Sequence, residues 1–357
     1  MRRLTFLLFA LCFGLCACTD SPQTQTTIPL KTGEYAAVLP YTTSNTRGKH
    51  IGLISDMDIR VQLEQGLMEL SKTYFPPSEV AFRTHVFLDY DELDSTDGSR
   101  GLLGTLRDNN PNGLNPSSDE DFDTGTGIVK GPILVLDLYE LDFYSGGDLK
   151  GIAIGLAVPD EVEEDGKTYS ITPEKIVEFV KASATKVVSY LRERFNEIPR
   201  DLPILVAAYE LNSNPSSVSK GGFVYMEYFN GLQSISSEIN EEYLLVPSSA
   251  FSVLEPQMAQ EFNDFRQEIA RILSDTTFTT GQARLRNGTV QKLTITISAY
   301  GKTVSEIWAV IQSVREKLAL FSSQSCLYKV IIENNGDVCA LMDRDPETTE
   351  VQVLTIY

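Results

Sequence analysis

The sequence predicts an α+β protein of two lobes, built from a tandem β-α-β-β repeat with an additional amphipathic helix in each lobe. The length of 357 residues suits about two domains. A hydrophobic content of 42% provides material for sizeable cores, and one order of strands and helices occurs twice along the chain. We place the first lobe at residues 33–238 and the second at residues 239–357.

The first unit begins with an alternating strand at residues 149–158. One face carries large apolar side chains and the other carries small residues: Ile152, Ile154, Leu156 and Val158 against Ala153, Gly155 and Ala157. A helix is expected from Thr172, with Pro173 in its first turn. Its apolar stripe is spaced by threes and fours: Ile176, Val180, Ala184, Val187, Leu191 and Phe195. Strands at residues 204–209 and 223–228 follow.

The second unit repeats this order. Residues 293–299 alternate as a strand, and Thr303 with Glu306 forms a capping-box pair that starts a helix. The apolar stripe of this helix is Ile307, Ile311, Val314, Leu318 and Phe321. Strands at residues 327–333 and 351–357 close the unit. Two Asn-Gly dipeptides, at residues 287–288 and 335–336, predict tight hairpin turns.

An amphipathic helix precedes the unit in each lobe. The apolar positions of the first are Ile59, Leu63, Leu67, Leu70 and Tyr74, and those of the second are Met258, Phe262, Phe265, Ile269 and Ile272. Residues 89–126 are rich in Gly, Asn, Asp and Ser, and we expect an irregular insertion there in the first lobe. The glycine pairs at residues 146–147 and 221–222 are expected to form turns between strands.

The N-terminal residues have the composition of a secretion signal. Two arginines precede 14 mostly apolar residues, Leu4 to Ala17, whereas a membrane-spanning helix needs about 20. Residues 15–18, Leu-Cys-Ala-Cys, fit the bacterial lipobox, in which the last cysteine accepts a diacylglyceryl group and a peptidase cuts before it. We expect a signal peptide at residues 1–17, cleavage between Ala17 and Cys18, and lipid attachment at Cys18.

The lipobox predicts a lipoprotein of the cell membrane, anchored on the extracytoplasmic face through a diacylglyceryl group. Its partners during maturation are expected to be the lipoprotein diacylglyceryl transferase and the lipoprotein signal peptidase. Acyl chains such as palmitate, two or more together, bind a membrane far more firmly than one chain does. Residues 18–32 are expected to form the lipidated N-terminus and a flexible polar tether. An ordinary signal peptide without lipid is the alternative.

Charge and histidine content argue against several function classes. The formal charge is −19 and no basic block occurs, so we expect no nucleic-acid partner. Loss of the leader removes two arginines and leaves 28 basic against 49 acidic side chains, a net charge of −21. The chain has two histidines, His50 and His85, and it lacks HExxH and GxSxG motifs and a glycine-rich phosphate loop. We therefore expect no catalytic residue, no metal, no cofactor and no enzyme activity.

An acidic cluster at residues 119–125 is similar to the start of a calcium loop. An EF-hand requires Gly at loop position 6 and Glu at position 12, where this chain has Thr124 and Lys130. We therefore expect a solvated acidic loop. The carboxylates of residues 89, 91 and 92 are expected to start a short helix beside Leu93.

Cys326 and Cys339 are the two cysteines of the predicted folded body. An exported chain permits a disulfide between them. The tight turn at residues 335–336 would place Cys339 opposite Ile332 and Cys326 opposite Asp345, too far apart for a bridge. We expect two partly buried thiols, and a bridge only if the strand bulges.

Several short motifs occur in order along the chain: Leu39-Pro40-Tyr41, Ser44, Arg47-Gly48, Glu64-Gln65-Gly66-Leu67, Leu70-Ser71-Lys72, Phe75-Pro76, Leu114-Asn115-Pro116, the strand at residues 151–157, Gly221-Gly222-Phe223, Glu242-Tyr243 and Val246-Pro247-Ser248. As a set they resemble the CamS-type lipoproteins of Gram-positive bacteria, which are described as sex pheromone precursors. The resemblance runs from the lipobox to about residue 250, and the last third agrees in pattern more than in motif.

This resemblance implies that the end of the leader is trimmed to a short apolar peptide that plasmid-bearing cells sense. By position it would comprise Leu11, Cys12, Phe13, Gly14, Leu15, Cys16 and Ala17. The two cysteines and Gly14 depart from a purely aliphatic pheromone, so an inert signal fragment is the alternative.

We expect the mature body to bind a ligand, which the sequence does not identify. A second hypothesis is a solute-binding or adhesin-like surface lipoprotein without a pheromone role, with its ligand held between the lobes. A third is a cell-wall-directed hydrolase. A deep apolar cleft with convergent polar groups would favour binding, and a buried carboxylate pair in a cleft would favour hydrolysis.

Overall fold

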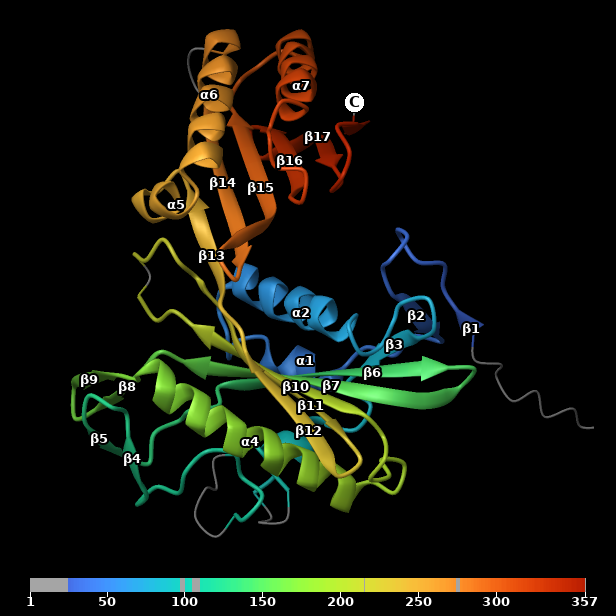
Figure 1. The fold of residues 1–357 in the computed structure, drawn as a ribbon, viewed down its shortest axis with the longest axis vertical. Helices are drawn as coiled ribbons and strands as arrows, with labels where there is room; N and C mark the ends of the chain where they lie inside the picture. The colour runs from blue at the N-terminus through green and yellow to red at the C-terminus, as the bar shows by residue number, and fades with distance from the viewer. Residues whose placement is uncertain (1–24, 97–99, 105–109, 215, 274–276, 357) are drawn as a thin grey trace, which may run out of the picture.

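The computed structural model describes residues 25–356, apart from residues 97–99, 105–109, 215 and 274–276. Its helices and mixed sheets confirm the predicted α+β class. An eight-stranded and a six-stranded sheet follow one another along the long axis of the molecule (Figure 1). The chain leaves the first sheet after β12 (Gln233–Glu238) and enters the second at β13 (Glu241–Val246).

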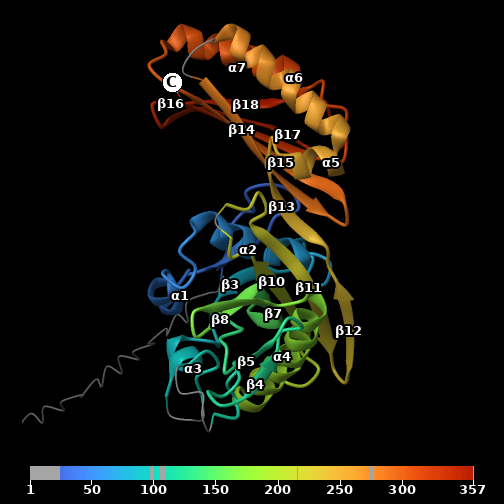
Figure 2. The same cartoon turned by 90° about the vertical axis from the view of Figure 1, so that its left-hand side faces the viewer.

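The first sheet has the order β1-β2-β3-β6-β7-β10-β11-β12. Its strands before β12 are β1 (Gln25–Thr26), β2 (Ala36–Leu39), β3 (Ala81–Thr84), β6 (Asp137–Ser145), β7 (Asp148–Pro159), β10 (Ile204–Leu211) and β11 (Gly221–Asn230). Helix α4 (Pro173–Arg194) covers one face, and α2 (Met57–Ser71) covers the other (Figures 1 and 2). The first lobe therefore has three layers.

The predicted alternation of large and small side chains along β7 explains why α4 and α2 cover opposite faces of the first sheet. Its large side chains pack in one core with α4, and its small ones lie in the core beneath α2. A Cβ atom on Gly155 would lie 3.1 Å from Leu63 and 3.2 Å from Leu67, so the small face lets α2 approach the sheet closely. Thr172 is the N-cap residue of α4 and Pro173 occupies its first turn, as predicted.

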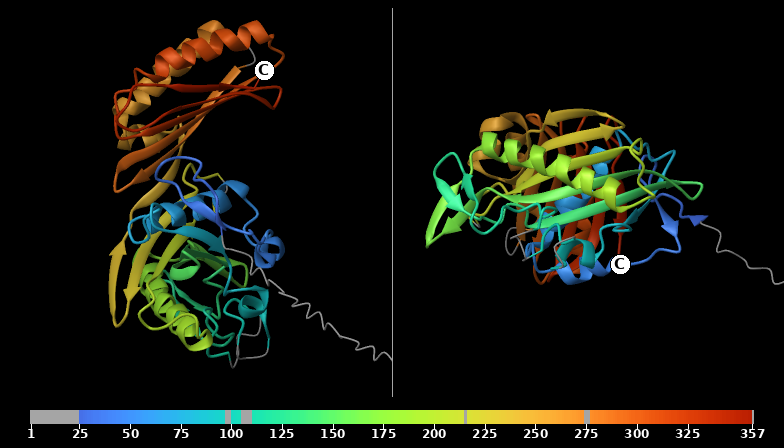
Figure 3. Two further views of the ribbon diagram at one scale, coloured as in Figure 1. Left: turned by 90° about the vertical axis from the view of Figure 1, so that its right-hand side faces the viewer. Right: turned by 90° about the horizontal axis from the view of Figure 1, so that it is seen from below.

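The second sheet has the order β13-β14-β15-β16-β17-β18. Its remaining strands are β14 (Thr277–Arg286), β15 (Thr289–Ala299), β16 (Leu327–Asn334), β17 (Asp337–Arg344) and β18 (Gln352–Thr355). The helices α5 (Ser249–Leu254), α6 (Pro256–Ile272) and α7 (Val304–Leu318) pack with one face of this sheet in a single core. Figures 2 and 3 show these helices on the side away from the first lobe, with the other face turned towards α2.

Strands β7, β10 and β11 pair in the same order and directions as β15, β16 and β17. Two details differ from the prediction. The tight Asn-Gly turn at residues 335–336 returns the chain at once as β17, so β18 lies outside β17 and does not pair with β16. The additional helices also lie differently, since α2 covers the face opposite α4, whereas α6 shares one face with α7.

Short elements complete the first lobe. Helices α1 (Asn45–His50) and α3 (Tyr90–Asp94) lie near β6, and the strand pairs β4 (Asp121–Asp123) with β5 (Ile128–Lys130) and β8 (Glu161–Glu164) with β9 (Lys167–Ser170) form two hairpins. The predicted insertion, residues 89–126, contains α3 and β4 at its ends and is otherwise irregular in its described part. Asp89 caps α3 by accepting a hydrogen bond from the backbone N–H of Glu92, as predicted.

The structure describes the predicted tether, residues 18–32, from Gln25 onward, and its residues 25–27 join the edge of the first sheet. Strand β1 pairs with β2, and the backbone N–H of Thr27 donates to the carbonyl oxygen of Ala37 over 2.8 Å. The open edge of β2 offers unpaired backbone groups that the extended chain satisfies. Over the described residues no helix has both the length and the apolar composition of a membrane span.

Candidate functional site

The residues of the strongest functional prediction lie outside the described part of the chain. They are the lipid attachment residue Cys18, the cleavage pair Ala17 and Cys18, and the peptide from Leu11 to Ala17. The structure places the candidate residues of the folded body in separate regions: His50 and His85 contact residues of β6, whereas Cys326 and Cys339 lie in the core of the second lobe.

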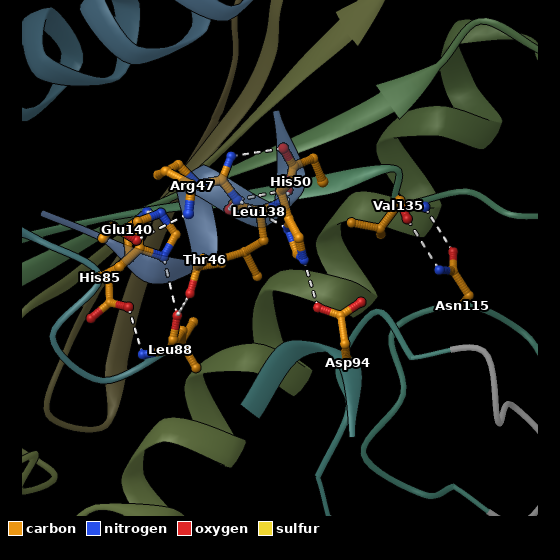
Figure 4. A network of polar contacts seen from close by, with 12 residues as sticks. Thr46, Arg47, His50, His85, Leu88, Asp94, Asn115, Val135, Leu138 and Glu140 are labelled. Carbon is orange, nitrogen blue, oxygen red and sulfur yellow. Dashed lines mark hydrogen bonds and ion pairs between the residues drawn. The ribbon is translucent and has the colours of Figure 1, made fainter. Parts of the chain in front are cut away.

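A buried ionic cluster ties α1 and α3 to β6 (Figure 4). The guanidinium of Arg47 donates to both carboxylate oxygens of Asp137 over 2.7 and 2.8 Å, and also to the carbonyl oxygen of Leu138 over 2.8 Å. His50 contacts Asp137 through Nδ1 at 3.1 Å and Asp94 through Nε2 at 2.6 Å. Each of the three elements thus contributes at least one charged side chain.

The charges in this cluster balance. Burial disfavours the charged form of Asp137, but hydrogen bonds from Arg47 and His50 hold its pKa below the ordinary value. Burial also disfavours charged His50, yet Asp137 and Asp94 together raise its pKa to about 9. At neutral pH two cations therefore face two carboxylates, and the face of Tyr139 lies 4.1 Å from the Arg47 guanidinium carbon. The arrangement fixes the position of α1 against α3 and β6.

His85 is held differently from His50. Its backbone adopts a positive φ of 48°, and its Nε2 accepts a hydrogen bond from the backbone N–H of Glu140 over 3.3 Å. The proton is therefore on Nδ1, which donates to the carbonyl oxygen of Leu88 over 3.1 Å. Burial lowers the pKa of His85 to about 3, so the ring is neutral at physiological pH.

Glu140 and Asp142 form a buried carboxylate pair on one face of β6. Glu140 accepts hydrogen bonds from the backbone N–H groups of Phe87 and Leu88 over 3.0 and 2.7 Å, and Asp142 accepts from Val86 over 3.1 Å. Burial raises the pKa of both groups, that of Asp142 more strongly. The exposed fractions of the two residues are 1% and 0%. The pair therefore holds the loop at residues 86–88 and lies out of reach of a substrate.

A pocket of about 620 Å³ lies on the outer side of this loop. Its lining is aromatic and apolar with two exposed carboxylates: Val86, Phe87, Tyr144, Gly147, Asp148, Leu149, Phe195, Glu197, Pro199 and Leu202. Its volume is in the range of small-molecule sites. All of its lining residues belong to the first lobe, whereas the sequence had suggested a ligand between the lobes.

Cys326 and Cys339 are both buried and are not joined by a disulfide. Their hydrogen-bond partners are backbone carbonyl oxygens, of Leu327 at 3.6 Å and of Asp337 at 3.4 Å. The predicted register was wrong by one residue, because an irregularity in the β16–β17 pair places Ala340, and not Cys339, opposite Ile332. Burial raises the pKa of the Cys326 thiol to about 12, which keeps it protonated and unreactive.

The predicted acidic loop has no arrangement for metal binding. Asp123 accepts a hydrogen bond from the backbone N–H of Gly125 over 2.9 Å and forms an ion pair with Lys175 at 3.1 Å. Nowhere in the described residues do three His, Cys, Asp or Glu side chains come together as metal ligands.

The family motifs found in the sequence serve the fold. The side-chain oxygen of Asn115 accepts hydrogen bonds from Leu134 and Val135 over 2.8 and 2.7 Å, and Ser44 caps α1. Gly222 lies within β11 and not in a turn as predicted. A Cβ atom there would lie 1.9 Å from the carbonyl oxygen of Glu241, so this position requires glycine.

Sequence reasoning missed the partners of His50 and Arg47. Asp137 and Asp94 are two carboxylates among 49 acidic residues, and neither belongs to a recognisable motif. One signal was present, since residues 137–143 have the apolar content of a buried strand that is interrupted by Asp137, Glu140 and Asp142. Carboxylates in a buried strand indicate paired or protonated groups.

The fold has known relatives. The crystal structure of a sex pheromone precursor from Lactobacillus salivarius is similar to this chain with a TM-score of 0.79 and 22% sequence identity, over 94% of this chain and 99% of that one. The C-terminal domain of the sex pheromone staph-cAM373 precursor from Staphylococcus aureus is similar with a TM-score of 0.68 and 23% identity, over 83% and 96% of the two chains. At these identities the likeness concerns the fold. No curated protein sequence matches this chain significantly.

Residues 41–350 match the CamS sex pheromone cAM373 precursor family. The match covers most of the chain and confirms the resemblance that the short motifs carry. It extends through the C-terminal third, where the motifs were weak. The chain belongs to the CamS sex pheromone cAM373 precursor family.

Proposed function

We propose that this chain is a lipoprotein anchored at Cys18 on the extracytoplasmic face of the cell membrane, and that its cleaved leader is a source of a short apolar pheromone-like peptide. The sequence Leu15-Cys16-Ala17-Cys18, directly after the apolar run of the leader, carries the proposal. Membership of a pheromone precursor family supports it.

The short length of chain between Cys18 and the first strand limits the distance between the folded body and the bilayer. Strand β1 begins at Gln25, seven residues after Cys18. An extended chain of that length reaches about 25 Å, so the edge of the first sheet formed by β1 and β2 stays close to the membrane. The net charge of −21 on the mature chain repels an anionic bilayer and keeps the body from lying on it.

Acyl labelling tests the anchor directly. Cells expressing the wild type, Cys18→Ala and Cys16→Ala are grown with a labelled fatty acid, and the protein is isolated. Cys16→Ala is the matched control, because it also removes a leader cysteine but keeps a small residue beside the cleavage site. We expect label in the wild type and in Cys16→Ala but none in Cys18→Ala. Equal label in all three contradicts attachment at Cys18.

A synthetic heptapeptide with the sequence of residues 11–17 tests the pheromone role. Plasmid-bearing recipient cells are exposed to it and to a scrambled heptapeptide of the same composition, and clumping or plasmid transfer is counted. The proposal predicts a response to the native order alone. No response, or the same response to both, leaves the leader as an inert signal fragment.

We also propose that the mature body binds a ligand. The pocket of about 620 Å³ in the first lobe supports a binding role, because three aromatic side chains and two exposed carboxylates line it. The buried pair Glu140 and Asp142 lies beneath the loop that forms one wall and is closed to solvent. This arrangement favours binding over the alternative of a cell-wall-directed hydrolase.

A further inference from the structure

Strand β12 is an open edge of the first sheet. It stands last in the strand order and pairs with β11 alone, and Figures 2 and 3 show it at the margin of the first lobe. All six of its residues are exposed, Ile235 by 67%. Leu232, in the turn before it, is 86% exposed. Such an edge offers unpaired backbone groups to another chain.

The register identifies these unpaired groups. The backbone N–H of Ile239, directly after β12, donates to the carbonyl oxygen of Val224 over 2.9 Å, in line with the β11–β12 pairs. Backbone groups alternate in direction along an antiparallel strand, so the odd-numbered residues of β12 face β11. The N–H and C=O groups of Ser234 and Ser236 therefore face outward, and within the described residues none of them has a hydrogen-bond partner.

The edge of β12 lacks the features that protect edge strands from pairing. Lysine, proline, a bulge or a very short length usually serves this purpose. The strand reads Gln-Ser-Ile-Ser-Ser-Glu, and its register with β11 is unbroken. By contrast, β1 has two residues, and the edge of β13 is occupied by backbone hydrogen bonds from and to residues 218–220.

We propose that β12 pairs antiparallel with β12 of a second copy of this chain, around a two-fold axis at Ile235. In this register the outward groups of Ser234 in one copy meet those of Ser236 in the other, which gives about four backbone hydrogen bonds. The two Ile235 side chains then lie opposite one another in a non-hydrogen-bonded pair, where side chains are closest. This dimer goes beyond the anchor and the ligand-binding role and depends on neither.

The same register brings opposite charges together. Arg192 of α4 donates to the carbonyl oxygen of Gly231 over 3.3 Å, and over the described residues no carboxylate lies within 4 Å of its guanidinium. Glu238 pairs with Tyr225, whose side chain packs with α4, so Glu238 lies on the face that α4 covers. The register places Glu238 opposite Leu232 of the second copy, next to Gly231. Each Glu238 thus approaches Arg192 of the other copy.

Repulsion between the copies does not oppose this register locally. The two Glu238 side chains lie at opposite ends of the strand pair, about 20 Å apart, which exceeds the Debye length of about 8 Å at physiological salt. The net charge of −21 on each mature chain is screened in the same way. Because one short strand pair makes a small interface, we expect a dissociable dimer that forms at high protein concentration.

Disulfide trapping tests the register. In the mature chain with Cys18→Ser, the remaining cysteines, Cys326 and Cys339, are buried, so an introduced thiol on β12 is the accessible one. Ile235→Cys places two thiols opposite one another across the two-fold axis, within the Cα separation of about 7 Å that a disulfide allows. We expect mild oxidation to give a covalent dimer of Ile235→Cys.

Ser237→Cys is the matched control, because it is also exposed and lies on the same face of β12. The register places it opposite Gln233 of the second copy and about 14 Å from its own counterpart, so it should remain monomeric. Leu354→Cys, on the exposed edge strand β18, should remain monomeric as well. No cross-link of Ile235→Cys, equal cross-linking of Ser237→Cys, or preferential cross-linking of Leu354→Cys overturns the proposal.

Sedimentation over a concentration series gives a second readout without introduced cysteines. Ser236→Pro removes an outward N–H, and an edge strand tolerates proline at such a position. Ser236→Ala keeps the N–H and is the control. We expect the wild type and Ser236→Ala to approach the mass of a dimer and Ser236→Pro to associate at least tenfold more weakly. A wild type that stays monomeric throughout, or equal association of the two variants, contradicts pairing through β12.

Discussion

Replacing His50 by glutamine removes the imidazolium through which the end of α1 contacts Asp137 and Asp94. The pKa of His50 is raised from 6.5 to about 9 in the folded protein. A raised pKa means that the folded state binds the proton more tightly than the unfolded state does. The stabilisation is therefore complete below pH 6.5 and is lost as the pH rises through 9.

The size of the effect follows from the two pKa values. Linkage gives about 2.5 kcal/mol of folding free energy at pH 7 and close to zero at pH 10. Urea unfolding of the wild type and His50→Gln at both pH values measures this difference. We expect the gap in unfolding free energy between the two proteins to narrow by about 2.5 kcal/mol from pH 7 to pH 10.

His85→Gln is the matched control, because it replaces the other histidine of the chain. The pKa of His85 is lowered to about 3, so its ring is neutral in the folded and largely neutral in the unfolded protein between pH 7 and pH 10. The gap between wild type and His85→Gln should therefore stay constant over this range. If His50→Gln gives a gap that is equally constant, the charged cluster around Asp137 does not exist as described.

Three further substitutions test the packing and the polar contacts by thermal or chemical unfolding. Gly151→Ala places a Cβ atom 2.0 Å from the ring of Phe75 and should lower the free energy of unfolding by about 1 to 3 kcal/mol. The control Gly48→Ala meets no atom within 4 Å and should be neutral or slightly stabilising. Equal effects of the two substitutions would contradict the close approach of Gly151 to Phe75. Asn115→Ala removes the acceptor for two buried N–H groups and should cost about 2 kcal/mol or more, and an unchanged midpoint would contradict its capping role. Arg344→Leu leaves three backbone carbonyl oxygens without their donor and should lower the free energy of unfolding by at least about 3 kcal/mol. An unchanged stability of this variant would contradict the role of Arg344 as their donor.

Local patterns were sufficient to predict much of the fold. Helix α4 begins where Thr172 and Pro173 indicate, and α7 has the capping box of Thr303 and Glu306. Both Asn-Gly turns adopt positive φ, at residues 287–288 and 335–336. These features depend on neighbours within a few residues, and sequence spacing reports such neighbours directly.

The remaining features depend on residues that are distant in the sequence. Arg47 and Asp137 are ninety positions apart, and nothing local to either indicates the partner. The face that α2 covers, opposite α4, is set by the close fit of Leu63 against Gly155, which periodicity alone cannot assign. The bulge beside Ile332 shifts the register of Cys339 by one residue, and a turn motif does not reveal a bulge farther along the strand.

Mass spectrometry of expressing cells tests the central claim most directly, because it examines both products of leader cleavage. We predict a membrane-extracted protein whose first residue is Cys18 with a diacylglyceryl group, together with a peptide in the spent medium that ends at Ala17. A mature protein with an unmodified N-terminus at another residue, and no peptide ending at Ala17, would contradict both the anchor and the pheromone precursor role.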